Sequence, residues 1–225
     1  PTSRYAEPFL RRLAREDQRA PLFVVHGKGS FGRQVVDGAE RMARQLGIDA
    51  HRLGPENDLQ PDGSWPAWDL FVAGSFEEDV QAVTRAQALP HPPRTVCAVA
   101  AGVQEFGDKV DDSDGVFGVG QWFPGSGPTA QVGPSEAEFL IAYAKLAGVT
   151  PDYPAVQAAA TATLVAHCAR HAGGVGRGLL WSAAAELDTE TLFGGFKIDP
   201  ATGVQTKHQT VLARWTPTGL AAVPN

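Results

Sequence analysis

The sequence has few cysteines, no long apolar run and no excess of positive charge. Its two cysteines, Cys97 and Cys168, form no CxxC spacing and no disulfide framework, so both are interpreted as buried free thiols. No stretch approaches the roughly 20 apolar residues of a membrane-spanning helix, and we therefore predict no direct membrane span. Because 25 acidic residues outnumber 19 basic ones, giving a net charge of -6 at pH 7, nucleic acid is not an expected partner.

The chain up to Trp122 alternates between strand and helix patterns. Short continuous apolar runs, such as 22–26 and 68–74, are typical of buried parallel strands, and each is followed by an amphipathic helical pattern. A polar, proline-rich loop is expected from 54 to 67. This alternation predicts an α/β fold in which a parallel sheet carries helices on both faces.

A connector rich in glycine and proline begins at Phe123 and separates this first zone from a helical one. Helices are predicted in the second zone at 135–147, 153–171 and 178–187. The tail returns to β character, and we expect 196–198 and 210–215 to pair as an antiparallel hairpin through the turn 200–203.

The segment GKGSFG, residues 27–32, fits the G-x-G-x-x-G pattern between a strand and a helix. A dinucleotide site also needs an acidic residue about 20 positions later, where this chain has His-Arg-Leu at 51–53. Ser30 does not fit the nucleophile elbow G-x-S-x-G, because Lys28 takes the place of the first glycine, and the segment does not fit a Walker A loop either. Three interpretations stay open: a nucleotide site in which Arg52 suits a 2′-phosphate, a tight turn that faces another ligand, or a purely structural turn.

Other clusters of polar residues have structural interpretations. His167 and His171 lie one helical turn apart beside Cys168, without an HExxH motif, and are read as a surface pair. The acidic residues in 111–114 lack the glycine and distal glutamate of a calcium loop, and those at 77–79 suit the start of a helix. No catalytic or metal-binding set can be named, so the sequence favours a binding protein without enzymatic activity and without a cofactor.

Five segments taken in order resemble the type I periplasmic binding proteins, and most of all their branched-chain amino-acid group, the Leu/Ile/Val-binding receptors of ABC transporters. The segments are VVHGKGSFGRQVVDGAERMARQLGI, WDLFVAGSFEEDVQAVTRAQAL, GVFGVGQWFP, FLIAYAKLAGVTPDYPAVQAAATATLVAHCARHAG and TLFGGFKIDPATGVQTKHQTVLARW. The resemblance covers nearly the whole chain. It implies two doubly wound lobes joined by three crossovers, with the ligand in the cleft between them.

The resemblance also implies a division of the chain. Residues 1–121 are expected to form the second lobe, a doubly wound parallel sheet, and 122–193 to cross over and supply helices of a first lobe that is incomplete here. Residues 194–225 are expected to return as a hairpin of the second lobe and a C-terminal tail. The sheet of the first lobe would normally precede Pro1, so we expect this chain to be the later part of such a protein.

The family's ligand-facing loops map onto six residues of this chain. The GKGSFG turn resembles a strand-to-helix loop whose aromatic residue, here Phe31, points into the cleft. The six predicted ligand-binding residues are Ser30, Phe31, Ser75, Phe76, Ala101 and Gly102. Ala101 lies where the amino-acid receptors carry an acid for the ligand's ammonium group, and burying an ammonium ion without a counter-charge is costly. We therefore expect a small organic acid ahead of a free amino acid.

The function implied is that of an extracytoplasmic solute-binding protein that passes a small-molecule ligand to the permease of an ABC transporter. It would work in the periplasm or outside the cell, and any lipid anchor would lie in a segment absent from this chain. The alternative is a ligand-sensing regulatory domain of the same fold that controls a fused or partner protein.

Overall fold

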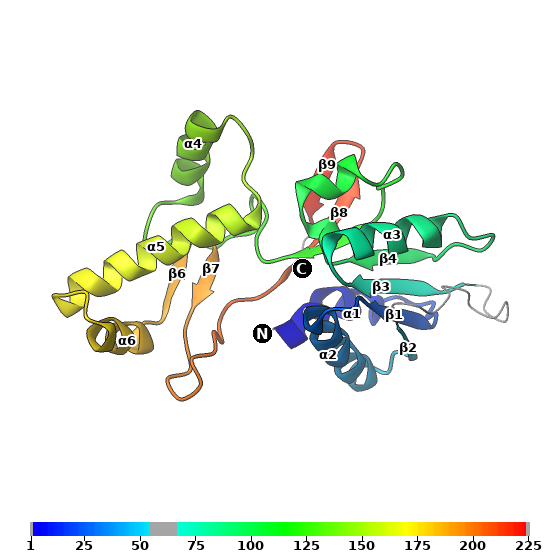
Figure 1. Ribbon diagram of the computed structural model, residues 1–225, viewed down its shortest axis with the longest axis horizontal. Coiled ribbons are helices and arrows are strands. Elements are labelled where there is room, and N and C mark those ends of the chain that lie inside the picture. The colour runs from blue at the N-terminus through cyan, green and yellow to red at the C-terminus, as the bar shows by residue number, and fades with distance from the viewer. Residues whose placement is uncertain (1, 55–66, 224–225) are drawn as a thin grey trace. The chain divides into compact units, whose positions relative to one another are not determined.

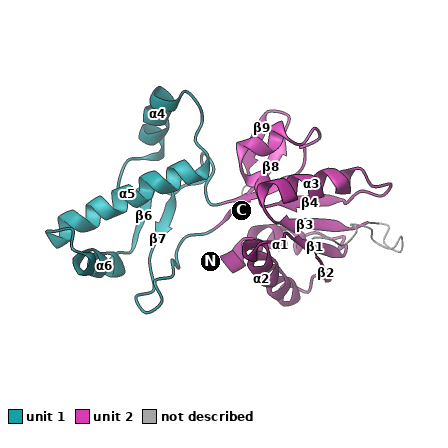
Figure 2. Cartoon of the chain, viewed as in Figure 1, with its two compact units in different colours: residues 1, 121–209 teal, residues 2–120, 210–225 magenta. Residues whose placement is uncertain are grey.

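The computed structural model describes residues 2–54 and 67–223, and these divide into two compact units (Figure 2). Unit 2 comprises Thr2–Gly120 and Thr210–Asn225, and unit 1 contains Gln121–Gln209. Most of the proline-rich loop expected at 54–67 lies outside the described residues. No helix within the described ranges is both long and apolar enough to cross a membrane.

Unit 2 is built on a seven-stranded sheet with the strand order β2-β1-β3-β4-β5-β8-β9. The first five strands in this order are parallel, whereas β8 runs antiparallel to both β5 and β9. The strands are β1 (Leu22–His26), β2 (Ala50–Leu53), β3 (Asp69–Ala73), β4 (Thr95–Ala98), β5 (Phe117–Gly120), β8 (Val211–Thr216) and β9 (Gly219–Ala222). The helices are α1 (Glu7–Leu13), α2 (Ser30–Leu46) and α3 (Phe76–Gln87), with short 3-10 turns η1 (Thr2–Arg4), η2 (Ala100–Gly102) and η3 (Gln104–Asp108).

Alternate residues of the central strands supply two separate hydrophobic cores. Phe23 and Val25 of β1 belong to the core beneath α3, whereas Leu22 and Val24 belong to the core beneath α1 and α2. Figure 1 shows α1 and α2 on one face of the sheet and α3 on the other. Because successive side chains of a strand point to opposite faces, an unbroken apolar run such as LFVV is buried on both sides. The predicted doubly wound α/β fold is confirmed.

Unit 1 contains three helices and a two-stranded antiparallel sheet among its described residues. They are α4 (Glu136–Ala147), α5 (Tyr153–Ala172), α6 (Arg177–Glu186), β6 (Thr189–Thr191) and β7 (Gly194–Phe196). Its core is small, and its fully buried members are Trp122, Val156 and Leu192. The helices α4 and α6 bury no residue completely, and large apolar side chains are exposed at Ile141, Leu146, Val149, Val165, Val175, Leu179, Trp181 and Val204.

The hairpin predicted between 196–198 and 210–215 is wrong. The strand β7 pairs with β6 in unit 1, and β8 pairs with β5 and β9 in unit 2. The turn after Ile198 does form, but it joins Ile198 to Gln205 through an isolated bridge. Two physical reasons account for the difference. The strand β7 lies close in sequence to β6, so closing the loop between them costs little conformational entropy. The strand β8 buries Leu212 in one core of unit 2 and Trp215 in the other, which favours its place in that sheet.

The chain passes between the two units at 120/121 and at 209/210, whereas the sequence led us to expect 121/122 and 193/194. The first junction differs by one residue. The second differs by 16, the difference between 209 and 193, because the segment that contains β7 folds with unit 1.

Candidate functional site

The loops after β1 and β3 begin side by side at the carboxyl edge of the parallel sheet. His26 pairs with Ala73 at the ends of these two strands, and the amide of Gly27 donates to the carbonyl of Ala73 at 2.9 Å. In open α/β sheets, ligands bind outside the carboxyl ends of the strands. This edge is the candidate site, because it brings four of the six predicted residues onto two adjacent loops.

The loop after β1 presents Ser30 and Phe31 at the start of α2. Gly29 is the N-cap of this helix and supplies no side-chain cap, and both following side chains are exposed. The Phe31 ring keeps 39% of its surface exposed and meets Tyr5 edge to face, with 5.6 Å between ring centroids. Because Tyr5 is buried, this contact holds the Phe31 ring in place while part of the Phe31 ring faces solvent.

Two of the three glycines of GKGSFG have packing roles within the protein. A Cβ atom at Gly32 would overlap the carbonyl oxygen of Ala73 in the neighbouring strand, and one at Gly27 would overlap the Glu78 carboxylate. A Cβ atom at Gly29 would meet nothing within 4 Å. Two of the glycines therefore permit the close approach of the β1 and β3 loops, which accounts for the match to a nucleotide motif without its function.

The loop after β3 contains a complete capping box. The Ser75 hydroxyl accepts from the amide of Glu78 at 3.2 Å and donates to Glu77 Oε2 at 3.0 Å. A hydroxyl has one donor and two acceptor positions, so these bonds leave one acceptor position on Ser75. Phe76 is half-buried and packs against the core beneath α3. Its neighbour Ser75 is exposed, so its hydroxyl could accept from a ligand or, by giving up its bond to Glu77, donate to one.

The turn after β4 is the third predicted segment, and the structure buries both of its predicted residues. Ala101 lies in the core beneath α3, and its carbonyl accepts from the Trp215 indole at 2.9 Å. A Cβ atom at Gly102 would lie 2.5 Å from the carbonyl oxygen of Val119. Neither residue presents a side chain to solvent, so Phe31, Ser75 and Ser30 are the exposed members of the predicted set. Contact of Ala101 and Gly102 with a ligand stays a prediction.

A buried carboxyl group lies directly behind these loops. Asp79, in the first turn of α3, is fully buried, and its Oδ2 accepts from the amide of Ala100 at 2.8 Å. Burial raises the pKa of Asp79 to about 7, although the amides of Ala100, Gly74 and Val99 lower it in part. The sequence pattern predicted that Asp79 is an acid at the start of a helix, and nothing in its spacing indicated burial.

The polar clusters outside this edge form structural contacts. The rings of His167 and His171 are parallel with centroids 6.5 Å apart, and Cys168 is buried beside His167. Within residues 2–54 and 67–223, no group of three or more His, Cys, Asp and Glu side chains is arranged to hold a metal ion.

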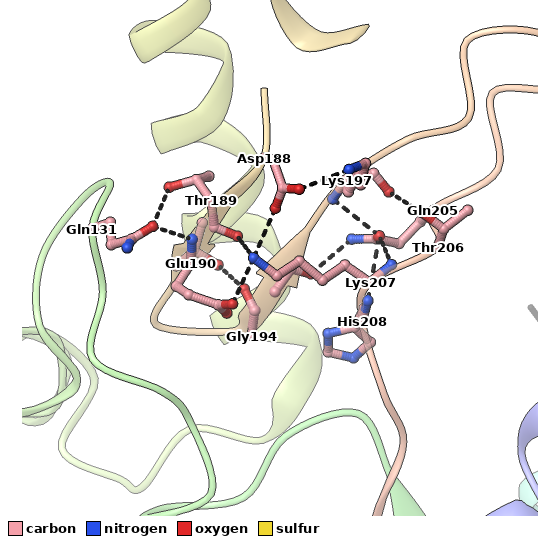
Figure 3. A network of polar contacts seen from close by, with 12 residues as sticks. Gln131, Asp188, Thr189, Glu190, Gly194, Lys197, Gln205, Thr206, Lys207 and His208 are labelled. Carbon is pink, nitrogen blue, oxygen red and sulfur yellow. Dashed lines mark hydrogen bonds and ion pairs between the residues drawn. The ribbon is translucent and has the colours of Figure 1, made fainter. Parts of the chain in front are cut away.

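Unit 1 holds a polar network that the sequence did not indicate (Figure 3). Asp188 accepts from both Lys197 and Lys207 at 2.8 Å, and these two lysines lower the pKa of Asp188 to about 2. The carbonyl oxygen of the Gln205 side chain accepts from the backbone amides of Lys197, Lys207 and His208. These bonds tie the chain after β7 back onto β6 and β7, so the network has a structural role.

Comparison with solved structures identifies the fold. No protein-family model and no curated protein matches the chain. Solved structures that match it include a leucine-binding protein from Thermotoga maritima, with 14% identity and a TM-score of 0.69. This match covers 99% of this chain and 63% of the Thermotoga chain. A periplasmic binding protein from Burkholderia mallei matches with 12% identity and a TM-score of 0.72, over 99% and 62% of the two chains. An amino-acid ABC transporter substrate-binding protein from Pseudomonas fluorescens matches with 15% identity and a TM-score of 0.68, also over 99% and 62%.

The chain thus has the fold of the type I periplasmic binding proteins, and it spans 62–63% of the length of these three structures. The neighbours are binding proteins, of which one is described as a leucine binding protein and another as an amino-acid ABC transporter substrate-binding protein. At identities of 12–15%, the likeness concerns the fold, and the ligand has to be argued from the residues of this chain.

Proposed function

We propose that this protein is an extracytoplasmic solute-binding receptor that carries a small ligand to the permease of an ABC transporter. The observation that carries the proposal is the carboxyl edge of unit 2, where the loops after β1 and β3 lie side by side and expose Ser30, Phe31 and Ser75. The fold likeness to periplasmic binding proteins supports a binding role and a place of action in the periplasm or outside the cell.

The proposed ligand is a small organic acid or an amino-acid-like molecule with an apolar or aromatic body. The exposed part of the Phe31 ring and the half-buried Phe76 offer apolar surface, and the exposed Ser75 hydroxyl can donate to a ligand carboxylate in place of Glu77 Oε2. Ala101 supplies no carboxylate where the amino-acid receptors resembled by this chain have one. An ammonium group left without a counter-charge would lose several kcal/mol on burial, so the six predicted ligand-binding residues, none of which is charged, favour a des-amino acid.

A thermal-shift screen tests this proposal on the longest natural form of the protein that contains this chain. Leucine, isoleucine and valine would be compared with 4-methylpentanoate, 3-methylbutanoate and phenylacetate. A ligand present at about 100 times its dissociation constant adds about 2.7 kcal/mol to the free energy of unfolding. We expect the largest shift from one of the acids that lack an amino group.

Variants at the carboxyl edge separate specific binding from general stabilisation. Phe31→Ala is expected to weaken the best ligand by about 5- to 160-fold, because a buried aromatic contact contributes of the order of 1–3 kcal/mol. Trp181→Ala is the matched control, since Trp181 is also a partly exposed aromatic residue but lies on α6 of unit 1. Stronger stabilisation by the three amino acids than by every acid would disprove the proposed ligand class, and no shift with any compound would count against a receptor for such solutes.

A further inference from the structure

The carboxylate of Glu78 joins two loops that are 50 residues apart in the sequence. Its Oε1 accepts from the amide of Lys28 in the loop after β1 at 2.9 Å. Its Oε2 accepts from the amide of Ser75 in the loop after β3 at 2.8 Å. Each oxygen therefore serves a different loop, and the side chain spans the gap between them.

Two glycines, Gly27 and Gly74, leave the space that this carboxylate occupies. A Cβ atom at Gly27 would overlap Oε2 of Glu78, and one at Gly74 would lie 2.8 Å from it. The Lys28 amide is the largest influence that lowers the pKa of Glu78, followed by the Ser75 amide, so the group is ionised at neutral pH. Hydrogen bonds from an amide to an ionised acceptor are roughly twice as strong as those between neutral groups.

The chain contains a second capping box that lacks the link between loops. Glu138 accepts from the amide of Ser135 at 2.8 Å at the start of α4, as Glu78 does from Ser75 at the start of α3. Within the part of the chain that the structure describes, Glu138 bonds only to Ser135. Local helix capping is therefore common to both glutamates, and the bond to Lys28 is the additional feature of Glu78.

We infer that Glu78 is a positioning residue of the proposed ligand site, where it holds the loop 27–31 against the loop 74–76 so that Phe31 and Ser75 are presented at a fixed separation. This inference rests on the proposed function. The reason that Glu78 is specific for this task is geometric: two separate oxygens accept from two separate amides. A glutamine has one carbonyl oxygen and an NH2 group, so it satisfies one of the two amides and opposes the other.

The test compares Glu78→Gln with Glu138→Gln by hydrogen exchange and by binding. In the protein without added ligand, Glu78→Gln is expected to speed amide exchange in 27–31 at least about tenfold, because a bond to a charged acceptor is lost there. Glu138→Gln should leave exchange in 27–31 unchanged. Glu78→Asp is a second variant, since it keeps the charge but is one methylene shorter and cannot reach both amides.

The binding arm uses calorimetry with 4-methylpentanoate, phenylacetate and leucine as probes. Glu78→Gln should raise the dissociation constant of any probe that binds the wild-type protein about tenfold or more, whereas Glu138→Gln should change it less than twofold. Faster exchange in 27–31 with unchanged affinity would overturn the positioning role. If no probe binds the wild-type protein, the proposed function fails. The exchange experiment still tests whether Glu78 orders the loop 27–31. Unchanged exchange in both Glu78 variants overturns the inference.

Discussion

Asp79 should make the stability of unit 2 fall as the pH rises through neutrality. Burial raises the pKa of this carboxyl from 3.8 to about 7, so the folded state holds a proton that the unfolded state releases. The stabilising contribution is complete below the unfolded-state pKa and is lost as the pH rises to the folded-state pKa. The difference between 3.8 and about 7 corresponds to roughly 4 kcal/mol, of which roughly 2 kcal/mol is lost between pH 5 and pH 7.

The substitution Asp79→Asn removes this titration and keeps a side chain of the same shape. We expect the free energy of unfolding of the wild-type protein, relative to that of Asp79→Asn, to fall by up to about 3 kcal/mol from pH 5 to pH 8. Urea unfolding monitored by circular dichroism at several pH values measures both curves. Taking their difference cancels other groups, including His208, whose pKa is lowered by burial and which acts in the opposite direction. Parallel curves for the two proteins would show that the amides around Asp79 outweigh its burial.

Two further predictions concern packing. Gly32→Ala should destabilise the protein by about 1–3 kcal/mol in the same urea titration, because its Cβ atom would overlap the Ala73 carbonyl. Gly29→Ala has open space and loses only the preference for glycine over alanine at an N-cap, so it should cost less than about 1 kcal/mol. Equal effects would contradict the packing role of Gly32. Leu192→Ala, in the core of unit 1, should lower the free energy of unfolding by about 2–5 kcal/mol. Leu146→Ala, at a side chain that is 89% exposed, should lower it by less than about 0.5 kcal/mol. A large loss of stability in Leu146→Ala would show that this side chain is covered in solution.

The sequence predicted the elements of unit 2 closely because their signals are local. The apolar run LFVVH became β1, since a strand buried on both faces needs apolar residues at every position. The helix α2 ends at Leu46, and the next residue, Gly47, has the left-handed conformation that glycine adopts at low cost. The partner of a strand is not a local property, however. Residues 194–196 and 211–216 both form strands. The alternation of apolar and polar residues along them does not indicate their partners, which are β6 for the first and β5 for the second.

The candidate site was predictable only in part for the same reason. Ser30, Phe31 and Ser75 were predicted from the resemblance to the ligand-facing loops of the type I periplasmic binding proteins, and they lie at the carboxyl edge because each follows a strand by a few residues. The spacing of Ser75 and Glu78 fits a capping box, which could have indicated the local half of the Glu78 interaction. Its other half, the bond to Lys28, depends on β1 and β3 being neighbours in the sheet. The burial of Ala101 likewise depends on Trp215, which lies 114 residues away in the chain.

The central claim is that a small solute binds at the carboxyl edge of unit 2. Amide chemical shifts measured with and without the most stabilising ligand of the thermal-shift screen test it most directly. The account predicts that the largest changes fall in 27–31 and 74–76, and that Glu78→Gln reduces them at a fixed ligand concentration. Changes confined to the polar network around Asp188 or to α5 and α6, with 27–31 and 74–76 unaffected, would contradict it.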